Sequence, residues 1–349
     1  MTGKLEQLAG TDQKIESQLS SEDFQNARRA TQAEHETTLN EALREHYMAV
    51  VWSAIVSLTI VMEGYDLNLM QNFFGYPSFT QQFGTFYPQT DSYQLTGAWQ
   101  AGLVQGTNVG VIIGGFLNGW LSARLGYRRT LIGALICQTG FVFISFFAVN
   151  APMLLAGQIL CGLTWGVYAT TGPAYASEVC PLALRGYLTI YVNLCWAMGQ
   201  FISSGIIKGL VSNETQWGWR IPVAVQWAWP VPIILGTLFA PESPWWLSRK
   251  GRQEEALRVL QRLSTSSEER CRDKLHQIQH TTLMEIEMAS NTSYWECFRG
   301  VNLRRTEICV MTFVGAQLSG SNFAYSPSYF LLQAGLDVEQ AYNVCIPQR

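Results

Sequence analysis

The sequence has few charged residues for its length. Of its 349 residues, 14% are Asp, Glu, Lys or Arg, whereas soluble domains carry about 25%. Residues 130–177 contain none of the four, and residues 186–241 contain only Lys208, Glu214 and Arg220. A soluble fold cannot cover stretches of this length with a solvated surface, so the pattern argues against a globular protein in water.

Other missing features exclude further classes. No basic tract is interleaved with aromatic residues, which argues against a nucleic-acid partner. The eight cysteines form no Cys-x-x-Cys pair, so we interpret them as small buried hydrophobic residues. Residues 1–46 lack the apolar core of a signal peptide, so the first apolar span is expected to insert the chain. Without a metal-ligand cluster, nucleophile elbow or phosphate-binding loop, we expect no enzymatic activity, no metal and no cofactor.

Long apolar stretches are present instead. A helix needs about 20 residues to cross a bilayer, and seven stretches qualify, near residues 48–69, 97–121, 129–149, 153–176, 187–210, 220–240 and 308–332. Barrel strands would alternate over about 10 residues, so we expect helices. The sequence therefore predicts an all-α integral membrane protein with a polar tail (1–46), a six-helix bundle (47–240), a helical loop (241–307) and a seventh span with the residues after it (308–349).

Lys and Arg are distributed unequally between the two sides of these spans. One side carries about twenty of them, eleven in residues 241–307, and the other carries two. Because basic loops stay in the cytoplasm, we expect the N-terminus and residues 241–307 to be cytoplasmic. The sequon that begins at Asn213 lies in a loop on the opposite side and makes Asn213 a candidate glycosylation acceptor.

Several short motifs occur in order around the spans. They are Gly-Trp-Leu-Ser-Ala-Arg-Leu-Gly-Tyr-Arg-Arg at 119–129, Pro-Ala-Tyr-Ala-Ser-Glu-Val-Cys-Pro-Leu-Ala-Leu-Arg-Gly at 173–186, Pro-Glu-Ser-Pro-Trp-Trp-Leu at 241–247 and Gln-Leu-Ser-Gly-Ser-Asn at 317–322. Together they resemble the sugar porter family of the major facilitator superfamily. Glu-Gly-Tyr-Asp at 63–66 and the string at 297–308 are similar to fungal α-glucoside (maltose-type) proton symporters.

The resemblance implies a fold, a substrate and a site. It implies a six-helix N-terminal half, a cytoplasmic helical loop and the first helix of a second half, in the plasma membrane, with a sugar (a disaccharide rather than a hexose), protons and the lipid bilayer as partners. The sugar-binding positions of the family map onto Asn193, Gln200, Gln317 and Asn322. Many sugar porters have an Arg in span four, where this sequence has Gln158. They also have an Asp before the first Arg of the motif at 119–129, where this sequence has Ala123.

Two acidic residues in the first span are candidates for proton coupling. Glu63 and Asp66 are three residues apart, so they share a helix face near the outer end of the span. An ionisable group in a membrane span is a functional-site hypothesis by default, and two close acids raise each other's proton affinity. The alternative is a pair exposed to water at the helix end.

Neutral amides suit sugar hydroxyls because they both donate and accept hydrogen bonds. Asn193 and Gln200 are seven apart and share a face, whereas Gln317 and Asn322, five apart, converge only if the helix is irregular near Gly320. Each amide could instead form an interhelical hydrogen bond.

Charged residues at the cytoplasmic ends of the spans could form a gate. Their ion pairs would form when the gate is closed and separate when it opens. The candidates are Arg124, Arg128, Arg129, Glu178, Arg185 and Glu242. Topology determination by basic residues is the alternative explanation of these charges.

The sequence stops at Arg349, soon after the seventh span. Transporters of this class commonly have two six-helix halves with the site between them. We therefore expect a C-terminally truncated sugar transporter that does not transport alone, or a half-transporter that needs a partner. A non-transporting membrane sugar sensor is the alternative function.

Overall fold

The computed structural model describes residues 21–88, 91–213, 215–289, 294–321, 327–336 and 340–342. The chain divides into two compact units, which are described separately. The first comprises residues 1–49, 178–185 and 242–322, and the second comprises residues 50–177, 186–241 and 323–349. The division differs from the sequence prediction, because the tail and the loop after the sixth span belong to one unit, together with the connection at 178–185.

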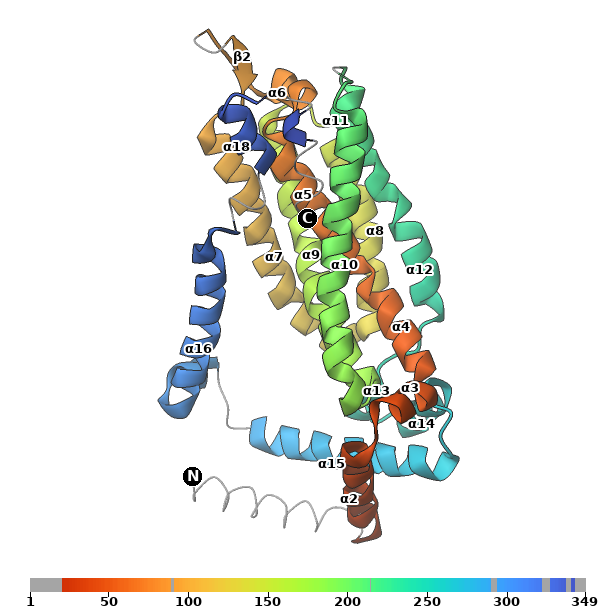
Figure 1. The fold of residues 1–349 in the computed structure, drawn as a ribbon. Coiled ribbons are helices and arrows are strands. Elements are labelled where there is room, and N and C mark those ends of the chain that lie inside the picture. The colour runs from red at the N-terminus through yellow and green to blue at the C-terminus, as the bar shows by residue number, and fades with distance from the viewer. Residues whose placement is uncertain are drawn as a thin grey trace. The chain divides into compact units, whose positions relative to one another are not determined.

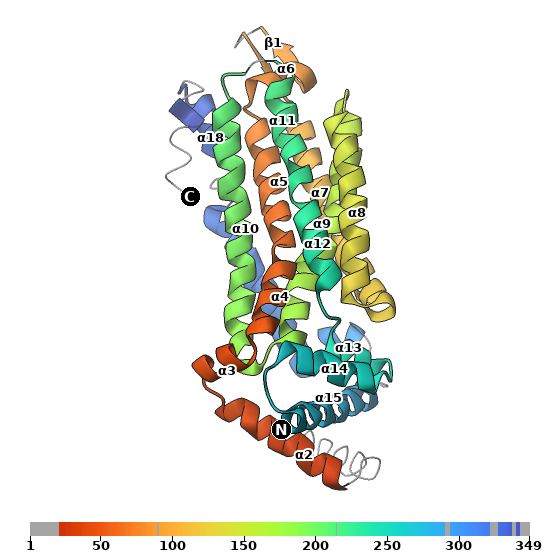
Figure 2. The same cartoon turned by 90° about the vertical axis from the view of Figure 1, so that its right-hand side faces the viewer.

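Helices form the second unit (Figures 1 and 2). Their bounds are α4 Tyr47–Ser57, α5 Thr59–Phe73, α6 Pro77–Phe83, α7 Gly97–Leu125, α8 Tyr127–Phe146, α9 Ala151–Val179, α10 Leu182–Leu210, α11 Trp217–Val225, a 3-10 turn Gln226–Ala228 and α12 Pro230–Phe239. Among the described residues, five helical segments are long and apolar enough to cross a membrane: Tyr47–Phe73, Tyr127–Phe146, Ala151–Val179, Leu182–Leu210 and Trp217–Phe239. The helix α7 has 29 residues but is less apolar, so the count of seven spans stays a prediction.

The described part of the span expected near 308–332 is irregular at Gly320. The helix α16 covers Gly300–Ala316, a π-helical turn follows at Gln317–Ser321, and α18 covers Pro327–Gln333. Gly320 has a φ of 92°, a left-handed conformation that a helix cannot continue through and that glycine adopts without a Cβ clash.

The loop after α6 contains a short hairpin within the otherwise helical fold. Strands β1 Thr85–Tyr87 and β2 Ser92–Gln94 pair antiparallel, with Phe86 opposite Tyr93. The two rings lie 5.2 Å apart between centroids, a cross-strand aromatic pair of the kind that stabilises short hairpins.

Glycines set the crossing of α7 and α9. A Cβ added at Gly114 would lie 2.0 Å from the carbonyl oxygen of Leu163, and one added at Gly110 would lie 2.3 Å from that of Ile159. From the other helix, a Cβ at Gly166 would lie 2.2 Å from the carbonyl oxygen of Val111. The two backbones are therefore in direct contact, as small residues permit in membrane helices.

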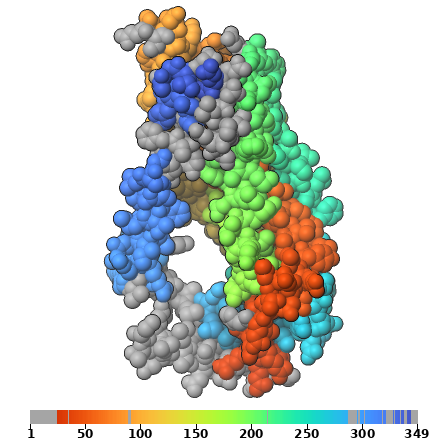
Figure 3. Space-filling model, viewed as in Figure 1, coloured from red at the N-terminus to blue at the C-terminus, as the bar shows by residue number. Residues whose placement is uncertain are grey.

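The outside of this unit is apolar. Large apolar side chains are exposed along α10, the green helix that faces the viewer in Figure 3, among them Tyr187, Ile190, Leu194 and Phe201. On α7, Ile112, Phe116 and Trp120 are exposed too. Patches of this extent are rare on soluble monomers, and they fit a surface that contacts lipid or another protein segment.

The first unit consists of shorter, more polar helices. They are α2 Ser21–Glu36, α3 Leu39–Glu45, α13 Pro244–Arg249, α14 Gln253–Leu263, α15 Glu268–Ala289, a 3-10 turn Tyr294–Phe298 and α16. Trp246, Leu247, Ala256 and Leu275 form a small buried core between α13, α14 and α15. The helix α2 packs along α15.

Candidate functional site

The side chain of Asp66 lies inside the second unit. It is 1% exposed, and its Oδ1 accepts a hydrogen bond from Nε2 of Gln226, in the 3-10 turn before α12. The side-chain amide of Gln158 on α9 lies near the same carboxyl. Oδ2 has no hydrogen-bond partner among the described residues. The alternative of a water-exposed acid at a helix end is therefore excluded for Asp66.

A hydrogen bond holds the Gln158 side chain in place. It is 2% exposed, and its Oε1 lies 3.4 Å from the Thr107 hydroxyl of α7, which donates to it. Neutral amides from α9 and the turn before α12 thus surround the Asp66 carboxyl. Within the described part of the chain, no Lys, Arg or His forms an ion pair with Asp66.

Glu63 lies one turn earlier on α5 and is only half-buried. The described residues give it no hydrogen bond and no ion pair, and no contact joins it to Asp66. The two acids therefore face different surroundings, and the expected mutual influence of a close pair is not visible in the structure.

The predicted sugar amides of the second unit lie on α10. Asn193 is exposed and Gln200 is half-buried, and neither side chain hydrogen-bonds to another described residue. The alternative of an interhelical hydrogen bond by these side chains is thus not seen. Their amide groups are available to a ligand.

The other two predicted sugar amides are only partly visible. The backbone of Gln317 begins the π-helical turn that contains Gly320, at the place where the sequence analysis required an irregular helix. The side chain of Gln317 and all of Asn322 lie outside the described residues. Gln317 also belongs to the first unit, so its convergence with Asn193 and Gln200 stays a prediction.

Three of the predicted gate residues lie in the second unit. The Arg124 guanidinium stacks 4.3 Å from the centroid of the Trp120 ring, and the Arg128 guanidinium donates a hydrogen bond to the Leu238 carbonyl of α12. Arg129 is exposed.

The other three gate residues lie in the first unit and form a polar cluster. The Glu178 carboxylate pairs with Arg249 at 2.6 Å and accepts a hydrogen bond from the Ser243 hydroxyl. Glu242 accepts from the backbone N–H of Ser243 at 3.2 Å, and Arg185 Nε donates to the Cys180 carbonyl at 3.2 Å. Sequence reasoning missed Arg249, although its position two residues after the motif at 241–247 could have indicated it.

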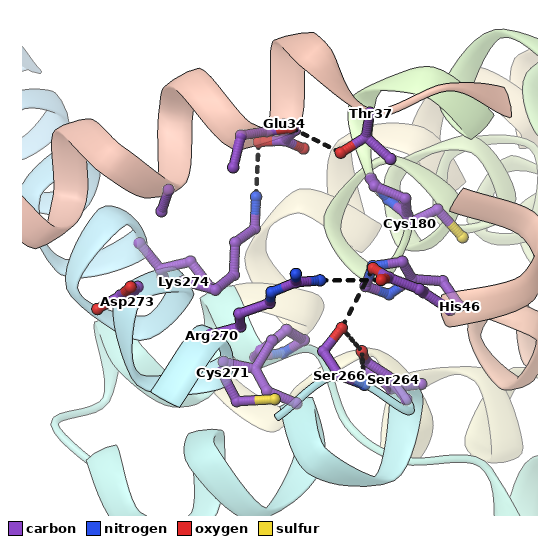
Figure 4. Close-up of a pocket in the computed structure, with 18 of the residues that line it drawn as sticks. Glu34, Thr37, His46, Cys180, Ser264, Ser266, Arg270, Cys271, Asp273 and Lys274 are labelled. Atoms are coloured by element: carbon purple, nitrogen blue, oxygen red, sulfur yellow. Dashed lines mark hydrogen bonds and ion pairs between the residues drawn. The ribbon is translucent and has the colours of Figure 1, made fainter. Parts of the chain in front are cut away.

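A cavity of about 580 Å³ lies in the first unit, lined by α2, α3, residues 178–185 and α13 to α15 (Figure 4). Glu34 and Lys274 point toward one another there, 2.6 Å apart, and Glu34 also accepts from the backbone N–H of Leu182 at 2.9 Å. Glu45 pairs with Arg270 at 2.9 Å. The helices α2 and α3, which lie in the predicted polar tail, are thus tied to α15.

Burial and neighbouring charge shift the pKa of Glu34 in opposite directions. Burial alone would raise its pKa, but the Lys274 ammonium and hydrogen bonds from Lys274, Leu182 and Gln277 outweigh burial, so its pKa lies below the ordinary value of 4.5. A carboxylate whose folded-state pKa is lowered stabilises the fold above its unfolded pKa and loses this contribution as the pH falls through the folded value. Docking of α2 is therefore expected to weaken below about pH 4.5.

Replacing Glu34 by Gln should loosen α2. The substitution removes the charge that Lys274 faces and leaves a partly buried ammonium unpaired, at a cost of about 1–3 kcal/mol. Amide hydrogen exchange in Ser21–Glu36 at pH 7 should accelerate about 5- to 150-fold. Glu36→Gln is the matched control, because Glu36 is exposed and, among the described residues, accepts only from Gln32 in the same helix. Equal exchange in the two variants would contradict the role given to Glu34.

Two remaining expectations concern modification and metals. Asn213 is half-buried, and its Oδ1 accepts from the backbone N–H and the hydroxyl of Thr215, at 3.1 and 2.6 Å. Glycosylation at Asn213 stays a prediction. No group of three or more His, Cys, Asp or Glu that could hold a metal ion occurs among the described residues.

The fold matches solved membrane transporters. The E. coli proton:xylose symporter XylE aligns with a TM-score of 0.70 and 20% sequence identity over 86% of this chain and 66% of that chain. Together with the apolar helices and the acid buried among them, this likeness defines the class: a helical membrane protein with the major facilitator fold.

Sequence comparison defines the family. The family described as "Sugar (and other) transporter" matches residues 52–346. The maltose permease MAL31 of Saccharomyces cerevisiae is 38% identical over 334 residues, which cover 94% of this chain and 54% of the permease. The general alpha-glucoside permease of the same yeast is 38% identical over 329 residues, 92% of this chain and 53% of that protein. The chain belongs to the sugar transporter family and spans about half the length of these curated relatives.

Proposed function

We propose that the chain serves in proton-coupled uptake of an α-glucoside, a maltose-like disaccharide, across the plasma membrane. The observation that carries the proposal is Asp66, a carboxyl buried in an apolar bundle and hydrogen-bonded to the neutral amide of Gln226. An ionised carboxylate is costly there without a cation, whereas a protonated one is tolerated. Asp66 is thus suited to bind a proton when the site is closed and to release it when water enters.

The amides of α10 support the sugar half of the proposal. Asn193 and Gln200 present donors and acceptors that the described residues do not use. Sugar hydroxyls need both kinds of partner, and neutral amides bind them without the desolvation cost of a charge. Gln317 and Asn322 are proposed to complete the site. The relatives named as maltose and alpha-glucoside permeases support an α-glucoside substrate.

Uptake measurements test this function. In yeast without α-glucoside permeases of its own, the protein expressed from its complete reading frame should take up radiolabelled maltose and make an unbuffered medium more alkaline as the sugar enters. Saturable maltose uptake without alkalinisation would contradict proton coupling. Absence of α-glucoside uptake, with the protein present at the plasma membrane, would contradict the proposed substrate.

The orientation is part of the proposal. The excess of Lys and Arg favours a cytoplasmic N-terminus and a cytoplasmic first unit. Trypsin should therefore cleave at Arg28 or Arg29 in α2 only after the cells are permeabilised. Cleavage at these residues in intact cells would place the N-terminus outside.

A further inference from the structure

The helix that carries the proposed proton site and the helix that carries the proposed sugar amides are in direct contact. A Cβ added at Gly64 of α5 would lie 2.2 Å from the carbonyl oxygen of Trp196 on α10. A Cβ added at Gly199 would lie 2.2 Å from the carbonyl oxygen of Val61. The two helices lie side by side in both Figure 1 and Figure 2, and their backbones touch at this point.

One turn further along both helices, a buried amide joins them. Asn68 is 2% exposed, and its Nδ2 donates to the backbone carbonyl of Gln200 at 3.1 Å and to the hydroxyl of Ser204 at 3.0 Å. The step from Gly64 to Asn68 equals the step from Trp196 to Gln200, four residues on each helix. The glycine contact and the amide therefore belong to one seam between α5 and α10.

The orientation of the Asn68 amide is fixed from its other side. Asn72, one turn on, donates from Nδ2 to Oδ1 of Asn68 at 3.1 Å and to its backbone carbonyl at 2.7 Å. Both acceptors of the Asn68 NH₂ group lie on α10, and Oδ1 of Asn68 accepts from Asn72 on α5. Reversing the amide would place its oxygen against the Gln200 carbonyl, so a single orientation satisfies all of its partners.

We propose that Asn68 is the positioning residue that holds Gln200 in its sugar-binding place. It does not contact the Gln200 side chain, whose amide stays available to a ligand. It fixes the backbone from which that side chain projects, and it does so from the helix that carries Asp66 two residues earlier. This inference rests on the proposed sugar-transport function, with Gln200 as a sugar ligand.

The test compares sugar affinity in single and double variants. Asn68→Leu has the same branched shape but no donor, so the KM for maltose should rise about tenfold, the effect of one or two lost buried hydrogen bonds. The maximal rate per transporter at the surface should change little. Because Asn68 acts through Gln200, the same substitution should have no further effect on KM in a Gln200→Ala background.

Two further variants keep the test decisive. Ser204→Ala removes one acceptor of Asn68 and should raise KM about threefold, again only when Gln200 is present. If Asn68→Leu fails to reach the membrane, Ser204→Ala alone tests the positioning role. Asn118→Leu is the matched control, because Asn118 is a buried amide that bonds to Thr170 and Thr171 instead, so its effect on KM should be independent of Gln200.

The outcomes separate the two proposals. If Gln200→Ala alone leaves the KM for maltose unchanged, the proposed sugar site is wrong. If Gln200→Ala raises KM but Asn68→Leu or Ser204→Ala raises it by the same factor in both backgrounds, the sugar site stands and the positioning role of Asn68 is wrong.

Discussion

Asp66→Asn is expected to abolish uphill accumulation of the sugar while the protein still folds. In the protein expressed from its complete reading frame, the ratio of internal to external sugar should fall to about one. For one proton per sugar, each pH unit across the membrane supplies about 1.36 kcal/mol, a tenfold accumulation. An Asn side chain cannot take up and release a proton, so this driving force is lost.

The geometry explains why the fold should survive this change. Oδ1 of Asp66 accepts from Gln226, and an Asn oxygen in the same place can accept that hydrogen bond. The Asn NH₂ group would replace Oδ2, which has no hydrogen-bond partner among the described residues. The change is nearly isosteric, and it removes an acid from a low-dielectric site.

The measurement is sugar accumulation together with counterflow. Exchange of labelled for unlabelled sugar, driven by the sugar gradient alone, should persist in Asp66→Asn because it does not need net proton movement. Undiminished uphill uptake by this variant would refute the proton-binding role. Loss of both accumulation and exchange, at normal surface abundance, would mean that Asp66 contributes to sugar binding instead.

The sequence could identify Asp66 because a charged residue inside an apolar span is costly unless it has a function. It could not identify Gln226 as a partner, since the two are 160 positions apart and only the packing of α5 against the turn before α12 brings them together. The sequence nevertheless showed Gln226 to be a polar residue within the apolar span 220–240. Asn68 was overlooked for the same reason, because its partner lies on α10.

The organisation of the first unit was the hardest part to predict. Residues 1–46 were interpreted as a polar tail, and within it Glu34 and Glu45 form ion pairs with Lys274 and Arg270 on α15. Such pairs join segments more than two hundred positions apart, and hydrophobic periodicity carries no signal for them. The irregular helix at Gly320 was anticipated only as a condition for Gln317 and Asn322 to converge, since glycine permits such a break without requiring it.

The sequence could predict that glycines form close helix crossings, because small residues at helical spacing permit close approach. It could not predict which glycines form them, since α7 also contains Gly102, whose added Cβ would meet nothing within 4 Å. This contrast within one helix supplies a matched pair of substitutions.

Gly114→Val should strongly destabilise the bundle. The new Cβ would lie 2.0 Å from the Leu163 carbonyl oxygen and 2.8 Å from its carbon, both backbone atoms that cannot turn aside as a side chain can. The helices α7 and α9 must therefore separate, which also disturbs the crossing at Gly110 and Gly166. Overpacking in a core typically costs 1–3 kcal/mol, and a clash with backbone lies at or above about 3 kcal/mol. For a protein stabilised by about 5–15 kcal/mol, this is a large part of the total.

Gly102→Val is the control, because it makes the same chemical change in the same helix where the added Cβ meets no neighbour. It should leave surface abundance and the melting temperature of the detergent-solubilised protein close to the unsubstituted values. Gly114→Val should lower the melting temperature by several degrees and deplete the protein from the plasma membrane. Equal melting temperatures for the two variants would show that α7 and α9 are not in backbone contact in the membrane. Gly114→Ala should fall between the two: its single methyl meets the same carbonyl, but it lacks the branched carbons that force the helices further apart.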